Sequence, residues 1–595
     1  MIQYEPHTIR ERLAALYEPD DAKEAYEGIR NLINEYREKV ESSHYRLSEK
    51  DAILITYADQ VQSPPEPPLK ELNDFLISHV DGMVNSVHLL PFYPYSSDDG
   101  FSVVDYKAVD PHCGSWNEVE LLSTHYRLMF DAVINHVSQF SEWFKKYLDD
   151  DPDYVDFFID ADPAQDLSSV VRPRTTPLLH EFADAQGRVR YIWTTFSRDQ
   201  VDLNYANYKV LLAVLDALFF YIEKGATLLR LDAIAFVWKE MGTPCVHLPQ
   251  THELIQLMRE VLHKVAPEVI IITETNVPHK ENVSYFGSGD DEAQMVYNFA
   301  LPPLLAYSVL TEDSSKLLEW AKTLKLPSDK VCFFNFTASH DGVGLRPVSD
   351  ILDRKAVAVL EAAARRSGGL VSYRTDPDGS ESPYELNCSY IDLLSPPEDE
   401  DAVRSKRMIL TQAAAMAMPG VPGIYFHSLF GSRNYLEGVK MTGINRSINR
   451  EKFNVNWLDA QLQEEGSLER KVYMAYKRLL SIRINETAFD PFGPFLFLEP
   501  HPGLFCIHRE SQHLDSHIFA VHNFRSEEVT FSLPDYIIVP ATECIANAPV
   551  TSSKVTIEKF GVMWIKCRID TEKFEQFCLG ESITLPETQT IKETK

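Results

Sequence analysis

The 595-residue chain is 44% hydrophobic and 24% charged, an ordinary globular composition that excludes a fibrous repeat and a largely disordered chain. Its 88 acidic residues outnumber 57 basic ones, and the formal net charge of −31 opposes binding to nucleic acid or to anionic membranes. The first residues lack an apolar signal core, and no apolar run reaches the roughly 18 residues of a membrane span, so the sequence predicts a cytoplasmic protein.

The first 50 residues are expected to form a helical N-terminal extension. Tyr26, Ile29, Ile33, Tyr36 and Val40 recur at helical spacing. One apolar stripe of this kind is enough to dock a helix onto a larger body. We therefore predict no catalytic role for this extension.

Eight short apolar runs follow, and longer amphipathic segments separate them. This alternation predicts an α/β fold, a closed parallel (β/α)8 barrel of the TIM type over residues 51–488. The active site of such a barrel lies at the carboxyl ends of its strands. The runs are 53–58, 87–92, 128–136, 227–236, 269–275, 295–301, 333–341 and 423–426.

Two spacings between the runs are too long for one loop and one helix, and predict inserted loop domains at about 140–210 and 345–405. After the barrel, short strand-like segments predict an antiparallel β domain over 489–568. Residues 569–595 are predicted to be a polar tail.

The end of the fourth run carries an arginine and an aspartate. Arg230 and Asp232 are two residues apart, so their side chains point to the same face of a strand. An arginine beside an aspartate is expected to keep it ionised, as a nucleophile must be.

Two further carboxylates end other runs: Glu274 the fifth and Asp341 the seventh, directly after His340. A single acidic residue at a strand end is more often a helix cap or a surface charge. Several in one barrel mouth indicate glycoside chemistry, because a retaining mechanism needs two carboxyl groups about 5 Å apart.

The segments LMFDAVINH, LLRLDA, IITET and ASHDG resemble the four signature regions of the α-amylase superfamily. The resemblance implies that Asp232 is the nucleophile, Glu274 the general acid/base and Asp341 the residue that stabilises the transition state. It places three more residues around the bound sugar: Arg230, His136 and His340.

Within that superfamily, LITYADQ, HLLPFYPYSSDDGFSVVDY, VRPR, NFALPPLL and GVPGIYF resemble the sucrose phosphorylase group. In this group phosphate replaces water as the second nucleophile and α-glucose 1-phosphate is released. The resemblance implies Arg174, in VRPR, as the phosphate ligand, since a guanidinium matches phosphate oxygens. The residues that it assigns to the glucose site are Asp98, Phe196, Gln200 and Arg446.

The chain departs from that group in its N-terminal extension and in Glu385, which follows Tyr384 where sucrose phosphorylases carry Gln. Tyr384 and Glu385 are therefore predicted to contact substrate. The segments TETNVPHKENVSYFGSGDDEAQMVY, GTPCVHLPQTH and GSRN resemble the glucosylglycerate phosphorylases, which implies 2-O-α-glucosylglycerate as the substrate. Glycerate and phosphate are both anions, so one cationic subsite can serve both. Candidates beside Arg174 are Arg198, Arg346 and Arg433, among which the sequence does not choose.

Alternative functions share parts of this pattern. A sucrose or glucosylglycerol phosphorylase has the same machinery, and an α-glucoside hydrolase has the same carboxylates. A non-catalytic amylase-like transporter subunit is disfavoured, because such proteins carry a membrane helix and lack the catalytic residues.

No cofactor is expected beyond phosphate as co-substrate. No metal is predicted either, since His247 and His252 lie in a polar stretch without evident further ligands. The eight cysteines lie far apart without a CxxC pair, which predicts free thiols. The expected partners are small molecules, and the oligomeric state is left open.

Overall fold

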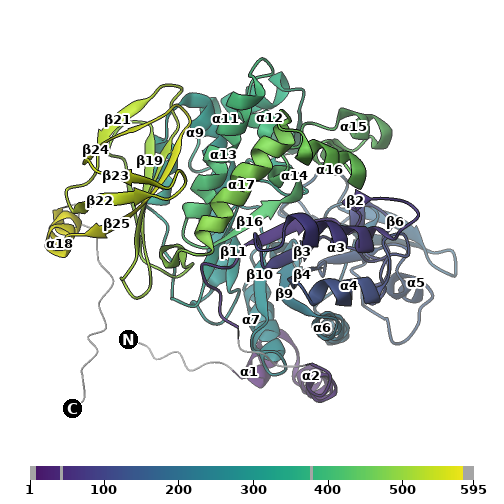
Figure 1. The fold of residues 1–595 in the computed structure, drawn as a ribbon. Helices are drawn as coiled ribbons and strands as arrows, with labels where there is room; N and C mark the ends of the chain where they lie inside the picture. Colours follow the sequence, from purple (N-terminus) through teal and green to yellow (C-terminus); the bar gives the residue numbers. More distant parts are fainter. Residues whose placement is uncertain (1–7, 41–44, 376–379, 581–595) are drawn as a thin grey trace, which may run out of the picture.

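The computed structural model describes residues 8–40, 45–375 and 380–580 (Figure 1). The predicted barrel is confirmed: eight parallel strands close on themselves in the order β1, β16, β12, β11, β10, β9, β4, β3. Each strand overlaps one of the eight apolar runs. Their bounds are β1 Ile53–Thr56, β3 Ser86–Leu89, β4 Arg127–Ala132, β9 Ala226–Leu231, β10 Ile270–Thr273, β11 Met295–Tyr297, β12 Cys332–Phe336 and β16 Val421–Tyr425.

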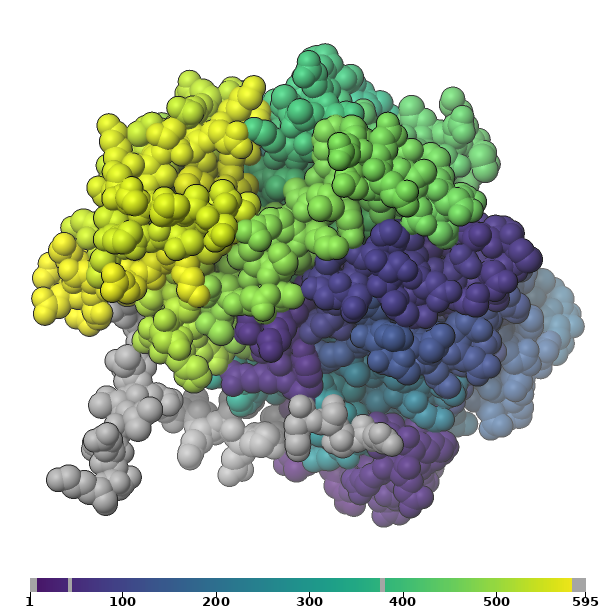
Figure 2. All heavy atoms as spheres, viewed as in Figure 1, coloured from purple at the N-terminus to yellow at the C-terminus, as the bar shows by residue number. Residues whose placement is uncertain are grey.

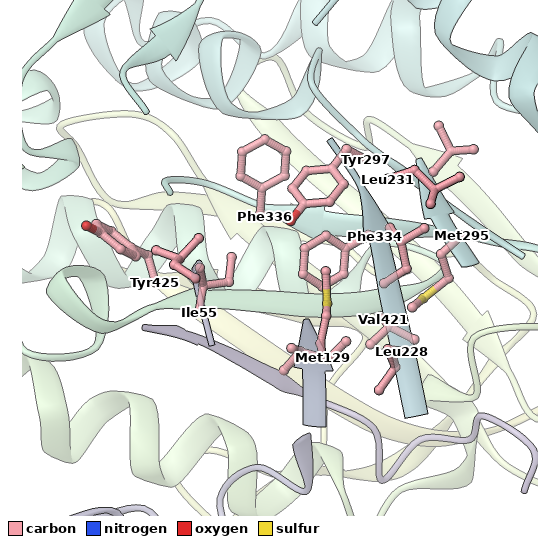
Figure 3. Packing of buried hydrophobic residues seen from close by; sticks show 14 of the residues in the cluster. Ile55, Met129, Leu228, Leu231, Met295, Tyr297, Phe334, Phe336, Val421 and Tyr425 are labelled. Carbon is pink, nitrogen blue, oxygen red and sulfur yellow. The ribbon is translucent and has the colours of Figure 1, made fainter. Parts of the chain in front are cut away.

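The strands are buried on both faces, as parallel strands covered by helices must be. Figure 3 shows side chains from several of them, including Met129, Phe334 and Val421, packed between the strands. Tyr297 and Phe334 meet edge to face with ring centroids 4.7 Å apart. The barrel interior is therefore a packed core and not a channel.

Helices cover the outside of the barrel (Figure 1). Most are amphipathic and bury one face against the strands, so the barrel is buried while their outer faces remain polar. The main ones are α3 Pro68–His79, α4 Trp116–Ser123, α6 Tyr208–Glu223, α7 Pro249–His263, α9 Leu301–Thr311, α10 Ser315–Ala321, α13 Asp401–Ala417 and α17 Leu468–Arg483.

The N-terminal extension forms two helices, α1 (Ile9–Leu16) and α2 (Pro19–Arg37). In Figure 1 they lie beside α7 and α6, the helices that they contact. The ring of Tyr36 stacks on Phe219 with centroids 5.3 Å apart, and its hydroxyl donates to Asp216 Oδ1 at 2.7 Å. The extension thus docks on barrel helices, and Tyr17 at the end of α1 also lies near Trp238 in the loop after β9, with ring centroids 6.4 Å apart.

Both long spacings contain additional structure beside the barrel mouth. In the first, helix α5 precedes the hairpin of β6 and β7, and β8 pairs with β5. In the second, helix α11 precedes β14 and β15, and β15 pairs with both β13 and β14 in a three-stranded sheet. The bounds are α5 Glu142–Leu148, β5 His136–Ser138, β6 Leu179–Ala183, β7 Val189–Trp193, β8 Gln200–Asp202, α11 Arg354–Arg366, β13 Val343–Gly344, β14 Leu370–Thr375 and β15 Glu381–Asn387.

The C-terminal β domain is antiparallel, as predicted, and forms a lobe beside the barrel (Figure 2). One sheet has the order β18, β19, β20, β25, β22, β23, and β21 pairs with β24. The bounds are β18 Phe495–Leu498, β19 Leu504–Glu510, β20 His517–Asn523, β21 Val529–Ser532, β22 Ile537–Glu543, β23 Ala548–Val550, β24 Lys554–Ile557 and β25 Val562–Ile569.

The segment predicted only as a polar tail begins with a helix, α18 (Thr571–Gly580). Phe574 and Cys578 of this helix are buried against the β domain, whereas residues 581–595 lie outside the described residues. All eight cysteines are described, and none forms a disulfide. Among the described residues, no helix has both the length and the hydropathy of a membrane span.

Candidate active site

A pocket lies at the carboxyl ends of the barrel strands. Apart from the arginines among which the sequence did not choose, its wall includes every predicted site residue except Arg230 and Glu385, which lie directly behind it. The lining residues are Asp98, Phe101, His136, Pro173, Arg174, Phe196, Gln200, Asp232, Ala233, Ala235, Phe236, Glu274, Thr275, Asn276, His340, Asp341, Arg346, Tyr384 and Arg446. Segments more than 300 residues apart therefore share one cavity.

Asp232 follows the last residue of β9 and points into the pocket beside Arg230. Arg230 Nη1 donates to Asp232 Oδ1 at 2.8 Å and also to the buried carboxylate of Asp131. The next residue, Ala233, has the left-handed conformation with φ +49°, rare outside glycine. This turn aims the Ala233 N–H at Glu274 Oε2, 3.0 Å away, and so couples the two strand ends.

Glu274 follows β10 directly, and its Oε2 lies 4.0 Å from Arg230 Nη2. Burial raises the pKa of Asp232 and of Glu274, Arg230 opposes both shifts, and each carboxylate sits among further acidic groups. Arg230 acts to lower the pKa of Asp232, but burial and the neighbouring carboxylates outweigh it. Because Arg230 contacts Asp232 at 2.8 Å and lies 4.0 Å from Glu274, it favours the charged form of Asp232 over that of Glu274.

Asp341 lies in the loop after β12, five residues beyond Phe336. Arg446 Nη1 is 2.5 Å and Arg450 Nη2 is 3.7 Å from Asp341 Oδ1. Burial acts to raise the pKa of Asp341, but these two guanidinium groups overcome it and lower the pKa. Asp341 is thus a fixed negative charge, unlike Asp232 and Glu274. These three residues are called the carboxylate cluster below.

Glu385 lies behind the pocket wall, with only 1% of its surface exposed. It binds Arg446 through both carboxylate oxygens, at 3.0 Å from Nε and 2.7 Å from Nη2. The sequence predicts that Glu385 contacts substrate; in the structure it does not line the pocket and lies behind Arg446. This bidentate pair holds the guanidinium in place beside Asp341.

Neutral polar groups and one aromatic ring form a second wall. Phe101, which the sequence did not single out, stacks on His340 with ring centroids 4.6 Å apart and planes 9° apart. Its carbonyl accepts hydrogen bonds from His136 Nε2 at 2.9 Å and Gln200 Nε2 at 3.2 Å. Burial, with Arg450 and Arg230 nearby, lowers the pKa of His340 well below its ordinary value, so its imidazole is neutral.

The remaining predicted wall residues are Phe196 and Asp98. Phe196 packs against His136, with ring centroids 5.4 Å apart. Asp98 lies in a tight turn that ends at Gly100, where φ is +105° and a side chain would collide with Pro91. Arg450, which the sequence analysis did not identify, reaches this turn, and its Nη1 lies 3.7 Å from Asp98 Oδ1. The sequence signal that could have identified Arg450 is its position four residues after Arg446 in GINRSINR.

Two arginines of the wall, Arg174 and Arg346, are called the pocket arginines. No carboxylate of the described residues lies within ion-pair distance of either one. Arg174 lies 5.9 Å from the ring centroid of Tyr384, and Tyr384 also interacts electrostatically with Arg346. The wall thus contains two guanidinium groups that form no ion pair among the described residues, although Arg174 interacts electrostatically with Asp341 and Arg346 with Glu281 at longer range.

The other two candidate arginines lie outside the pocket. Arg198 donates to the Glu181 carbonyl at 2.8 Å and covers the ring of Phe182. Arg433 donates to Asp392 Oδ1 at 2.5 Å. The structure therefore selects Arg346, not Arg198 or Arg433, as the cation that accompanies Arg174.

Residues 80–341 match the family model of the α-amylase catalytic domain. The structure resembles sucrose 6F-phosphate phosphorylase from Thermoanaerobacter thermosaccharolyticum, with a TM-score of 0.72 and 22% identity over 86% of this chain and 99% of that chain. The fold and the strand-end carboxylates thus define an enzyme of the α-amylase class.

Two relatives match nearly the whole chain. The glucosylglycerate phosphorylase of Spirochaeta thermophila is 44% identical over 556 residues, 92% of this chain and 94% of that protein. The glucosylglycerate phosphorylase of Escherichia coli is 43% identical, over 91% of this chain and 95% of that protein. The chain belongs to the family of α-amylase-type glycoside phosphorylases that contains these proteins, and it is itself a glycoside phosphorylase.

Proposed function

We propose that the enzyme converts 2-O-α-D-glucosylglycerate and phosphate into α-D-glucose 1-phosphate and D-glycerate. The observation that carries this choice is the pair of pocket arginines. Glycerate and phosphate are both anionic, and guanidinium groups without an acidic partner offer them charge-assisted hydrogen bonds. The glucosylglycerate phosphorylases among the relatives support the same substrate.

In the first step Asp232 attacks the anomeric carbon of the bound glucoside. A C1–O bond to Asp232 forms as the bond from C1 to the glycerate oxygen breaks, and Glu274 transfers its proton to that oxygen. Glycerate leaves with a protonated 2-hydroxyl group, and its carboxylate keeps its negative charge. The raised pKa of Glu274 suits this role because the acid must be protonated before the step.

In the second step phosphate occupies the subsite that glycerate has left. A phosphate oxygen attacks C1, the ester bond to Asp232 breaks, and the Glu274 carboxylate accepts the proton of the attacking hydrogen phosphate. Two inversions at C1 give net retention, so the product is the α-phosphate. Asp232 and Glu274 then return to their starting protonation states.

We assign Asp341 and Arg446 to the glucosyl group itself. The negative charge of Asp341 stabilises the positive charge that develops at C1 in the transition state, since it stays ionised beside Arg446 and Arg450. Neutral His136 and His340 suit hydrogen bonding to sugar hydroxyls. No step of this scheme uses a metal or an organic cofactor.

Sucrose and glucosylglycerol remain the alternative donors, and a plain hydrolase the alternative reaction. Their acceptors, fructose, glycerol and water, are neutral and leave the pocket arginines without a charged partner during donor binding. We propose the cytoplasm as the compartment, because eight free thiols suit a reducing environment.

The test is incubation of the purified enzyme with glucosylglycerate, glucosylglycerol or sucrose, each with and without phosphate. We expect α-glucose 1-phosphate from glucosylglycerate only when phosphate is present. Formation from sucrose or glucosylglycerol alone would overturn the choice of substrate. Release of glucose independent of phosphate would identify a hydrolase.

A further inference from the structure

Three residues of the C-terminal domain form a group that the phosphorylase mechanism does not use: His508, Glu510 and His517. Their possible ligand atoms all lie within 4.8 Å of one another, and no other group of three in the described chain meets this condition. Glu510 on β19 pairs directly with His517 on β20, and His508 lies two residues before Glu510. All three side chains therefore project from the same face of the sheet.

His508 is fully buried, and neither of its ring nitrogens has a hydrogen-bond partner among the described residues. The Nδ1 of His517 also lacks one, and lies 3.6 Å from Glu510 Oε2. Buried polar groups normally have partners, because leaving one without them costs about 1–3 kcal/mol. Several such atoms that face one another therefore indicate a ligand that is shared by the group.

Aromatic side chains pack against His508 in this group. The His508 ring stacks on Tyr536 with centroids 5.4 Å apart, and the ring of Phe574 meets its edge at 5.1 Å. Phe574 belongs to α18, so this helix covers the group. An enclosing apolar shell strengthens the attraction between a cation and the Glu510 carboxylate, since little water screens it.

We propose that His508, Glu510 and His517 bind one Zn²⁺ ion. Two imidazoles and a carboxylate are a donor set that zinc accepts, with bonds of roughly 2.0–2.2 Å. Ligand atoms already within 4.8 Å of one another reach such bonds by small side-chain rotations. Calcium and magnesium fit poorly because they require mostly oxygen ligands. The site lies in the β domain, so the scheme for glucosyl transfer without a metal is unaffected.

The expected role is structural. Zinc bound to these strands would hold β19 and β20 together beneath α18 and add stability to the folded state only. Glycoside phosphorylase activity is not expected to require it. The signal in the sequence is the spacing His-x-Glu followed by a histidine across a hairpin, which is informative only once the strand register is known.

The experiment uses the full-length protein without an affinity tag, stripped with a chelator and dialysed against excess ZnCl₂. Metal analysis after desalting is expected to find one zinc per chain in the wild type and none in Glu510→Gln or His517→Gln. His513→Gln, an exposed histidine of the same hairpin, is the matched control and should keep its zinc. Zinc at about 100-fold above its dissociation constant should raise the Tm of the wild type and this control by about 2 °C or more.

A chain that retains no zinc would overturn the proposal, as would equal retention by the wild type, Glu510→Gln and His517→Gln. Binding of Co²⁺ provides a second readout, because a site with these ligands gives a visible absorption band that both variants should lose. Far-UV circular dichroism of each variant checks that it is folded. If one variant does not fold, the zinc content and the Co²⁺ absorption of the other variant decide.

Discussion

The carboxylate cluster and the pocket arginines share one cavity but differ in how their charges are held. Asp232, Glu274 and Asp341 each contact an arginine or a backbone N–H. Arg174 and Arg346 have no carboxylate within ion-pair distance in the described chain. The carboxylate cluster, which cleaves the glucosidic bond, is therefore preorganised by protein contacts. The pocket arginines, which recognise the acceptor of the glucosyl group, are not.

This difference has a physical reason. Groups that stabilise a transition state must already be oriented, so their partners lie within the protein. A subsite that exchanges glycerate for phosphate must instead leave its cations available, although burial lowers the pKa of Arg346. In a chain of net charge −31, these arginines provide the local attraction that an anion needs.

The largest effect is expected at the nucleophile. Asp232→Asn removes the group that forms the glucosyl-enzyme, so kcat/KM should fall by at least about 10⁵-fold. Steady-state assays with glucosylglycerate and phosphate measure this loss. The Tm should stay within a few degrees of the wild type. Substantial residual turnover in a contamination-free preparation would contradict the assignment of Asp232.

Glu274→Gln should lower kcat/KM for glucosylglycerate by about 10²- to 10⁴-fold. The kcat/KM of this variant for α-glucosyl fluoride should fall much less, because fluoride needs no proton to leave. Because the Glu274 charge raises the pKa of Asp232, its removal should lower that pKa and move the acidic limb of the pH profile to lower pH. The basic limb, which reports deprotonation of Glu274, should disappear.

The pH profile of fluoride release tests these shifts. An acidic limb that moves to higher pH, or equal losses with both donors, would contradict the acid/base role of Glu274. Binding of glucose should be unaffected, since Glu274 acts on the leaving oxygen.

The next-largest loss of activity is expected at the pocket arginines. Arg174→Ala should reduce phosphorolysis by roughly 10- to 100-fold, because a charge-assisted contact contributes about 1.5–3 kcal/mol. Hydrolysis in the absence of phosphate should change much less. Arg346→Ala should show the same pattern, and Arg198→Ala, outside the pocket, is the control that should resemble the wild type.

Phosphate saturation curves and glucose release measured on the same preparations provide both rates. Equal losses of phosphorolysis and hydrolysis in Arg174→Ala would show that the residue does not act on the anion. A loss in Arg198→Ala as large as that in Arg346→Ala would contradict the choice between these two arginines.

The smallest effect is expected at Glu385, which acts through Arg446. Glu385→Gln keeps the shape but removes one charge from the bidentate pair, so the KM for the glucosyl donor should rise by roughly 5- to 30-fold. The ratio of phosphorolysis to hydrolysis should stay constant, since the pocket arginines are untouched. A changed ratio with an unchanged KM would show direct contact of Glu385 with the acceptor.

The sequence alone determined the barrel, its eight strands and the positions of Asp232, Glu274 and Asp341. Local patterns were sufficient there, because apolar runs of strand length form the barrel core and the residues that follow them must face one mouth. The antiparallel C-terminal domain was predictable for a similar reason.

Only the tertiary structure decided the rest. It placed Glu385 behind Arg446, selected Arg346 over Arg198 and Arg433, and revealed helix α18 and the group around His508. These features depend on which side chains meet across loops and strand pairs that lie far apart in the chain. Strand periodicity fixes the face on which a residue lies, whereas its partners are fixed only by the packing of the whole chain.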